Sequence, residues 1–143
     1  MGKNIIETGD EIKTLLENTK RIAVLGIKTE EQSFQPAYYV PEYLSRAGFE
    51  IVPVPVYYPD VTEILGQKVY RSLAEIPGEI DLVNVFRRSE DVPKHTEDIL
   101  SKKPKAVWLQ SGIRNDDAAR IWAEAGIKVV QNKCLMVVHR ELF

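Results

Sequence analysis

The sequence predicts an α/β domain with a parallel sheet of about five strands and helices on both faces, in three layers. Short, β-rich apolar runs alternate with longer amphipathic runs, and this order is typical of parallel strands joined by crossover helices. The apolar runs are continuous, as strands buried on both faces require. A length of 143 residues suits one core, so we expect a single domain over residues 1–143.

The first half of the chain is expected to contain two strands and two helices. Asp10 caps an opening helix, and the helix after the first strand contains Pro41, which marks either its first turn or a kink. A proline-rich loop after the second strand leads into a short helical turn. In order, the expected elements are a helix over 9–18, a strand over 21–26, a helix over 36–47, a strand over 50–54 and a helical turn over 61–65.

The second half repeats this alternation. Pro93 falls in the first turn of one helix, a position that favours proline, and Asn115 or Asp116 caps the next helix. The expected elements are a short helix over 72–76, a strand over 81–86, a helix over 92–101, a strand over 106–110, a helix ending at 125, a strand over 127–131 and a short C-terminal helix. This succession predicts a Rossmann-like, doubly wound sheet, in which ligands bind outside the carboxyl ends of the strands.

The composition narrows the classes of function. The net charge is -2, so there is no basic excess of the kind that nucleic-acid and membrane-surface binders need. The single cysteine, Cys134, excludes an internal disulfide and fits a reducing compartment. No CxxC or paired-histidine spacing indicates a metal site. Residues 1–10 contain no long apolar run, so we expect neither a signal peptide nor a membrane anchor, and a cytoplasmic protein.

The turn after the first strand is a candidate phosphate site. Gly26 permits a tight turn and a close approach of ligand to backbone. The helix beginning near Pro36 offers N–H groups and its positive dipole end, and Ala37 and Tyr38 would donate because proline has no N–H. The G-x-G-x-x-G fingerprint is absent, and no carboxylate follows the second strand until Asp60. An NAD-dependent dehydrogenase is therefore disfavoured.

Basic residues follow four of the predicted strands, at Lys28, Arg87, Arg88, Arg114 and Lys133. A ligand with several phosphates favours such a collar, because one arginine binds two phosphate oxygens at once. Scattered basic residues are common, so only the Arg87-Arg88 pair is singled out for a ligand role. Phe86, directly before the pair, is interpreted as both a core residue and a wall for an adenine.

Short segments spread along most of the chain carry a recognisable pattern, at residues 21–26, 43–44, 48–49, 52–54, 64–66, 69–77, 81–83, 85–88, 107–110, 112–113, 132–136 and 139. Together they resemble the small CoA-binding protein family, whose domain is similar to the CoA-binding N-terminal domain of the succinyl-CoA synthetase α subunit. The resemblance extends from Arg21 to about Leu142. It implies that the ligand is coenzyme A (CoA) or an acyl-CoA.

The resemblance also implies where the parts of CoA lie. The loop after the first strand would hold phosphates, the segment after the second strand would border the nucleotide, and the segment after the third would meet adenine and phosphate. The pantetheine arm would pass Gly112 and Ile113. The implied cofactor-binding residues are Gly26, Ile27, Lys28, Gln35, Pro36, Ala37, Tyr38, Pro53, Val54, Phe86, Arg87, Arg88, Gly112 and Ile113.

Two departures from the family bear on this ligand. The run 53–56 reads Pro-Val-Pro-Val where the family has Pro-Val-Asn-Pro, which removes an amide beside the nucleotide. Glu30 and Glu31 make the first loop acidic, and they would repel phosphate unless they point outward. These changes imply weaker CoA binding or a different ligand.

No catalytic constellation is found, so we expect a binding protein that is not an enzyme by itself. The resemblance implies that the synthetase reaction uses a phosphorylated histidine in a later domain. His95 is interpreted as a solvated surface residue, and His139 as a packing or C-terminal hydrogen-bonding residue. Cys134 is interpreted as a packing residue, with a mixed disulfide to the CoA thiol as the alternative.

Two other functions stay open at this point. One is a CoA-dependent enzyme component whose partner subunit supplies the catalytic residues. The other is an interaction domain that has lost its ligand, which the Pro55-Val56 departure favours. We expect a small-molecule nucleotide ligand and no nucleic acid, membrane or metal, with a homodimer or a partner subunit as further alternatives.

Overall fold

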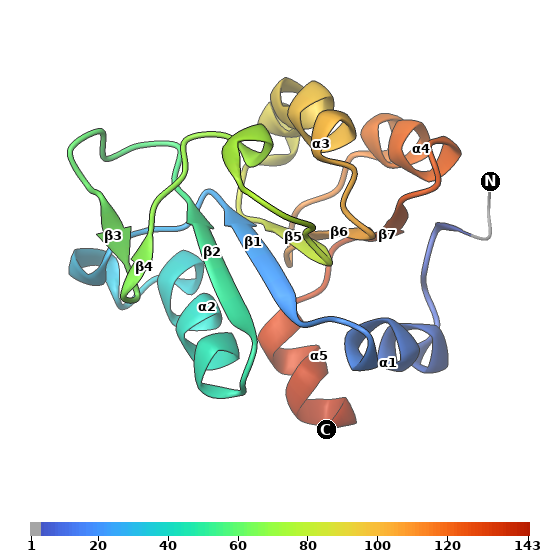
Figure 1. Cartoon of the computed structure of the whole chain (residues 1–143). Helices are drawn as coiled ribbons and strands as arrows, with labels where there is room; N and C mark the ends of the chain where they lie inside the picture. The colour runs from blue at the N-terminus through green and yellow to red at the C-terminus, as the bar shows by residue number, and fades with distance from the viewer. Residues whose placement is uncertain (1–3) are drawn as a thin grey trace.

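The computed structural model describes residues 4–143 and contains the predicted five-stranded parallel sheet (Figure 1). Residues 1–3, part of the stretch expected to carry no signal or anchor, lie outside the described residues. The strands follow the order β2-β1-β5-β6-β7, and every neighbouring pair is parallel. Their bounds are β1 Arg21–Leu25, β2 Glu50–Val54, β5 Leu82–Val85, β6 Ala106–Leu109 and β7 Lys128–Val130. The strand order reverses between β1 and β5, the place where such sheets bind ligands.

Helices cover both faces of the sheet, which confirms the three-layer Rossmann-like architecture (Figure 1). On one face lie α1 Gly9–Glu17, α2 Pro36–Arg46 and α5 Leu135–Leu142. On the other lie α3 Thr96–Lys102 and α4 Asp116–Glu124. Within residues 4–143, no helix has both the length and the apolar character needed to cross a membrane.

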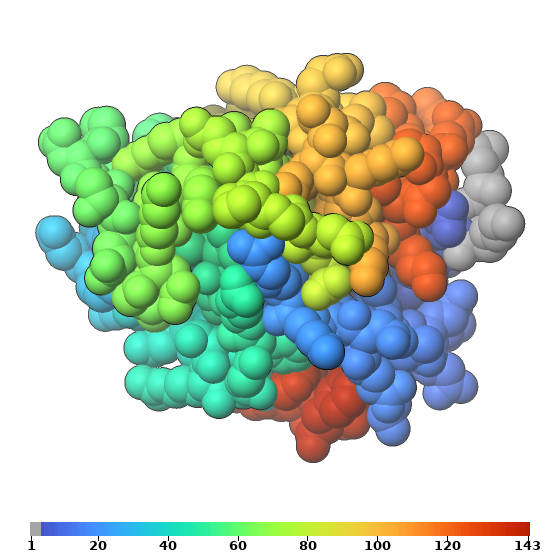
Figure 2. All heavy atoms as spheres, viewed as in Figure 1, coloured from blue at the N-terminus to red at the C-terminus, as the bar shows by residue number. Residues whose placement is uncertain are grey.

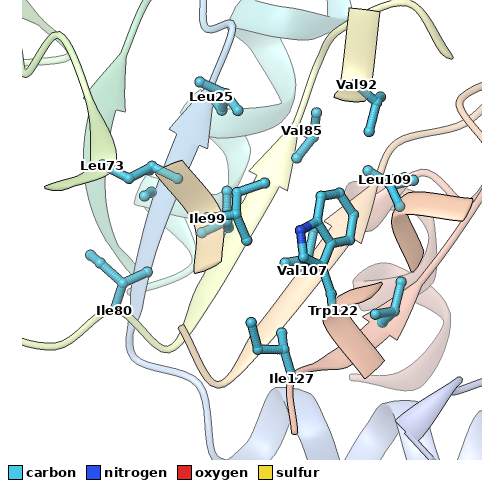
Figure 3. Close-up of a cluster of buried hydrophobic side chains, with 14 of the residues drawn as sticks. Leu25, Leu73, Ile80, Val85, Val92, Ile99, Val107, Leu109, Trp122 and Ile127 are labelled. Atoms are coloured by element: carbon cyan, nitrogen blue, oxygen red, sulfur yellow. The ribbon is translucent and has the colours of Figure 1, made fainter. Parts of the chain in front are cut away.

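Each face of the sheet has its own hydrophobic core. Val85 and Val107 pack with Ile99 and Trp122 beneath α3 and α4 (Figure 3). Residues of the opposite strand face, such as Val24, join the second cluster beneath α1, α2 and α5. Because both strand faces are buried, apolar residues stand at consecutive positions, and burying each large one contributes roughly 1.5–3 kcal/mol.

The predicted helical turn over 61–65 is wrong. The chain forms an antiparallel hairpin there, β3 Glu63–Ile64 with β4 Gln67–Lys68. Leu65 and Gly66 make its two-residue turn with φ of +54° and +73°. Two successive positive φ values are typical of a type I′ turn, whose twist matches that of the two hairpin strands. Leucine rarely adopts a positive φ. Ile64 is fully buried and anchors the hairpin to the domain.

The segment predicted as one helix over 92–101 is divided into a 3₁₀ helix and an α-helix, and the α-helical part begins only at Thr96. A 3₁₀ helix, η4 Ser89–His95, comes first, and α3 follows from Thr96. Because the helical path already starts at Ser89, Pro93 falls beyond its first turn, where the missing N–H interrupts α-helical bonding. The short helix near 72–76 is also 3₁₀, as η3 Leu73–Glu75, and a third 3₁₀ turn, η2 Glu30–Gln32, precedes α2.

The helix caps match the sequence in part. Thr8 caps α1 in place of Asp10, because its hydroxyl accepts a hydrogen bond from the Glu11 N–H at 3.2 Å. Asn115 caps α4 as predicted, accepting from the Ala118 N–H at 3.0 Å. Pro41 lies inside α2, whose first residue is Pro36.

Candidate functional site

The carboxyl ends of β1, β5 and β6 open into a cavity of about 520 Å³, called the strand-end cavity below. It lies beside the switch point of the sheet, between the loops that follow β1, β2, β5 and β6. Its wall consists of Gly26, Ile27, Lys28, Gln35, Pro36, Ala37, Val56, Tyr57, Tyr58, Phe86, Arg87, Arg88, Gln110, Ser111, Gly112 and Ile113.

Most of the residues singled out from the sequence meet in this cavity. The ones that line it are Gly26, Ile27, Lys28, Gln35, Pro36, Ala37, Phe86, Arg87, Arg88, Gly112 and Ile113. Tyr38, Pro53 and Val54 are buried beside it and do not line it. The Val54 carbonyl accepts a hydrogen bond from the Gly26 N–H at 2.8 Å, so the end of β2 holds the turn that follows β1.

Five lining residues were not predicted: Val56, Tyr57, Tyr58, Gln110 and Ser111. The first three continue the segment after β2, where the sequence pointed only to the residues before them. Gln110 follows β6 and is a polar residue at the end of a buried run, which was a usable signal.

Gly26 sets the geometry of the first turn. Its φ is +88°, a left-handed conformation that residues with a Cβ rarely adopt. A Cβ at this position would lie 2.3 Å from the Phe86 carbonyl oxygen. The backbones after β1 and β5 therefore approach each other more closely than any other residue type permits.

The loop between β1 and α2 is held by an unusual backbone bond. Pro41 has no N–H with which to bond the Ala37 carbonyl, four residues earlier in α2. The Lys28 N–H donates to that carbonyl at 3.1 Å, so the proline inside the helix frees an acceptor for the cavity loop. The Tyr38 N–H, expected to serve a phosphate, donates instead to the Gln35 carbonyl at 2.9 Å.

The acidic residues of this loop do not line the cavity. Glu30 Oε2 accepts the Leu65 N–H of the hairpin turn at 2.9 Å, so this carboxylate points toward β3 and β4. Figure 2 shows the green hairpin segment lying against the blue residues that precede α2. Glu31 is exposed and also lies outside the cavity wall.

Arg87 is the cation fixed at the cavity wall. Its side chain is only 12% exposed, and its Nε donates to His95 Nε2 at 3.2 Å. Its guanidinium carbon lies 6.0 Å from the centre of the Tyr57 ring, within range of a cation–π contact. Asp91 is its nearest carboxylate, with Oδ2 3.9 Å from Nη2.

Arg88 differs from its neighbour in exposure. Its side chain is 77% exposed, and its Nε lies 3.1 Å from Asp91 Oδ2. Lys94 Nζ lies 3.0 Å from the other oxygen of Asp91. Hydrogen bonds from Lys94 and then Arg88 hold the pKa of Asp91 below its usual range. Asp91 therefore pairs with Arg88, a residue of the cavity wall, without lining the cavity itself.

His95 is not the solvated residue that the sequence indicated. It is the last residue of η4, is half-buried, and contacts Arg87 of the loop after β5. Burial and then the charge of Arg87 lower the pKa of His95. The register of η4 could not be read from the sequence, so this contact was missed.

Arg71 holds the loop after β2, which forms one wall of the cavity. Its guanidinium donates to the carbonyls of Tyr57, Tyr58, Pro59 and Val61, at distances of 2.7 to 3.3 Å. One planar group therefore holds four carbonyls of a five-residue segment without regular structure.

The floor of the cavity is tied to α5 through Gln110, which is 4% exposed. Its Oε1 accepts from Asn84 Nδ2 at 3.2 Å and from the Leu135 N–H at 3.3 Å. A buried amide at this point orients the start of α5 toward the ends of β5 and β6.

The remaining candidates lie outside the cavity wall. His139 Nδ1 is 2.7 Å from the Tyr43 hydroxyl, and its ring stacks on Phe143, in agreement with a packing and hydrogen-bonding role. Cys134 is half-buried against the core beneath α5. Among residues 4–143, no group of three or more His, Cys, Asp or Glu side chains is arranged to hold a metal ion.

Comparison with known proteins assigns a family to most of the chain. Residues 20–140 match the family model of a CoA binding domain. An uncharacterized protein of Bacillus subtilis (strain 168), YneT, is 40% identical over 129 residues, which are 90% of this chain and 92% of that protein.

Solved structures agree with this match. The Thermus thermophilus protein cell-free ID.343 superposes with a TM-score of 0.87 at 37% identity, over 96% of this chain and 100% of that one. A hypothetical protein from Pyrococcus horikoshii OT3 gives 0.84 at 31%, over 95% and 92%. The dinucleotide-forming acetyl-coenzyme A synthetase 1 of Ca. Korarchaeum cryptofilum shares the fold, with a TM-score of 0.67 at 18% identity, over 80% of this chain and 26% of that enzyme.

Proposed function

We propose that the chain, which belongs to the CoA-binding domain family, binds CoA or an acyl-CoA in the strand-end cavity and performs no chemistry by itself. The observation that carries the proposal is the meeting, in one cavity, of a tight glycine turn, a fixed arginine and an aromatic wall. A glycine turn and an arginine suit phosphates, and an aromatic wall suits an adenine.

The size and lining of the cavity support this ligand. A volume of about 520 Å³ lies in the range of sites that bind small molecules and cofactors. Arg87, Arg88 and Lys28 supply positive charge for the phosphates. Tyr57 and Phe86 offer faces for the base, and Gly112 and Ile113 leave an apolar path for the pantetheine arm.

The departures noted in the sequence weigh less against CoA than expected. Glu30 is bonded to the hairpin, which removes its carboxylate from the cavity wall. Pro55 stands where the family has an asparagine, but the same loop supplies Tyr57 and Tyr58 to the cavity. An interaction domain without a ligand is therefore the less favoured reading.

A second proposal is that the chain is the CoA-binding component of an enzyme whose partner subunit supplies the reacting groups. The same fold occupies about a quarter of a larger acetyl-CoA synthetase. Within residues 4–143, the cavity wall contains no histidine, cysteine or carboxylate that could act as nucleophile or base. Turnover of a CoA thioester by the purified chain alone would contradict the binding-only proposal.

Isothermal titration calorimetry tests the first proposal. CoA and acetyl-CoA should bind one site per chain, whereas NAD should not. Arg87→Ala should weaken CoA binding by about 10- to 100-fold, since a hydrogen bond to a charged group contributes roughly 1.5–3 kcal/mol. Arg120→Ala is the matched control, because Arg120 lies on α4, is exposed and does not line the cavity. Equal binding by both variants would overturn the assignment of phosphate to Arg87.

A further inference from the structure

The Arg87–His95 contact joins a residue of the strand-end cavity to one that does not line it. We propose that His95 is a positioning residue, whose neutral imidazole accepts the hydrogen bond of Arg87 Nε and orients the guanidinium toward the ligand, so that CoA binding weakens on acidification. This inference rests on the proposed function, because it concerns the same cavity. It adds a regulator of affinity that does not itself contact CoA.

The hydrogen bond fixes the chemical state of His95. Arg87 Nε carries a hydrogen and has no lone pair to accept with, so His95 Nε2 must be the acceptor. The imidazole must therefore be neutral, with its proton on Nδ1. Once Nε2 is protonated, two donors with positive charge face each other at 3.2 Å, and the contact is lost.

The surroundings of His95 favour the neutral form. Arg87 faces it from the loop after β5, Asp91 and Lys94 from η4, and Asp98 from α3. Burial and the two cations lower the pKa of His95, and together they outweigh the two carboxylates, which raise it. The pKa of His95 therefore lies below the ordinary value of about 6.5. Near neutral pH the contact is therefore intact, and it breaks as the pH falls through this lowered pKa.

Arg87 depends on this contact for its orientation. Its carboxylate partner, Asp91, is 3.9 Å away and is already bound by Arg88 and Lys94 at 3.1 and 3.0 Å. The contact with the Tyr57 ring, at 6.0 Å, restrains the height of the guanidinium above the ring but not its rotation. The directional bond to His95 is what sets the plane of the fork, and a fork binds phosphate well only in the right plane.

Two substitutions of His95 distinguish its role as a hydrogen-bond acceptor for Arg87 from the space that its side chain fills. His95→Gln can keep an acceptor oxygen near the place of Nε2 and cannot be protonated in this pH range, whereas His95→Leu keeps bulk and removes the acceptor. His139→Gln is the matched control, because His139 is the other histidine of the chain and lies outside the cavity wall. Thermal melting of each variant shows whether it is folded before binding is measured.

The experiment measures the CoA dissociation constant by calorimetry between about pH 8 and pH 5. At about pH 8, His95→Leu should bind CoA about tenfold more weakly, the size expected for one hydrogen bond to a charged group. His95→Gln should stay within about threefold of the wild type. The CoA phosphate also titrates, with a pKa near 6, but it does so equally in all the proteins.

The comparison at low pH is therefore made between variants. The wild type and His139→Gln should lose more affinity than His95→Gln as the pH falls through the lowered pKa of His95. Nitrogen-15 NMR of the ligand-free wild type supplies a second readout. It should show the His95 imidazole neutral at pH 7 with the proton on Nδ1.

The outcomes distinguish this inference from the proposed function. If the wild type binds CoA and His95→Leu binds equally well with the same pH profile, the positioning role is wrong and the CoA site stands. If NMR places the proton on Nε2, the inference is overturned whatever the affinities are. If the wild type does not bind CoA at any pH, the proposed function fails and the regulatory role fails with it.

Discussion

A single methyl group at Gly26 should disrupt both the fold and the strand-end cavity. Gly26 has a φ of +88°, and a Cβ placed on it would meet the Phe86 carbonyl oxygen at 2.3 Å. That oxygen belongs to backbone next to β5 and cannot rotate away as a side-chain tip can. Gly26→Ala must therefore move one of the two strand ends that form the cavity.

The cost has two parts that can be estimated separately. Placing alanine at a positive φ costs about 1 kcal/mol. Forcing a methyl group into occupied space in a packed region costs about 1–3 kcal/mol more. Together they predict a loss of about 2–4 kcal/mol in the free energy of unfolding, which corresponds to a melting temperature lower by roughly 6–16 °C for a domain of this size.

Gly126 provides the control for the cost of placing alanine at a positive φ. Its φ is +89°, nearly that of Gly26, but a Cβ there would have nothing within 4 Å. Gly126→Ala should therefore cost only about 1 kcal/mol and leave CoA binding unchanged.

Denaturant unfolding of both variants gives the two free energies, and calorimetry with CoA gives the two affinities. Gly26→Ala should be the less stable protein by about 1–3 kcal/mol and should bind CoA at least tenfold more weakly. If the two variants were equally stable and bound CoA equally well, the steric reading of Gly26 would be refuted.

Three further substitutions test what holds the cavity and the domain. Arg71→Lys keeps the charge but loses the planar fork, so the loop 57–61 should be cleaved faster by protease and CoA should bind about tenfold more weakly. Burial acts to raise the pKa of Asp81, but bonds from two backbone N–H groups and a lysine lower it. This stability is present above the ordinary aspartate pKa of about 3.9 and is lost as pH falls through the lower folded value. Asp81→Asn should cost about 1–2 kcal/mol at pH 7 and flatten that acid limb in denaturant titrations. Burial lowers the pKa of His139, so its stabilisation is present above about pH 6.5 and fades below it; His139→Gln should reduce the change in melting temperature between about pH 7 and pH 5.

The sheet and its helices were predictable because burial on both faces leaves a strong signal. Runs such as 22–25 are apolar at every position, and both faces of β1 are indeed buried. The hairpin was not predictable in the same way. Its turn has Leu65 at a positive φ, a conformation that the local preference of leucine does not indicate.

Part of the candidate site was likewise predictable from the sequence, and part of it was not. Gly26 and Arg87 could be placed in it because the ends of parallel strands must meet at one edge of the sheet. The contact of Arg87 with His95 depends on where η4 begins, and the Arg71 clamp depends on the path of an irregular loop. Neither is fixed by periodicity or spacing, so both emerged only from the structure.

A crystal structure grown with CoA tests the central claim most directly. The account predicts CoA in the strand-end cavity, with a phosphate oxygen about 3 Å from the Arg87 guanidinium and the adenine against the wall that contains Tyr57. CoA bound elsewhere on the chain, or a cavity that stays empty at saturating CoA, would contradict it.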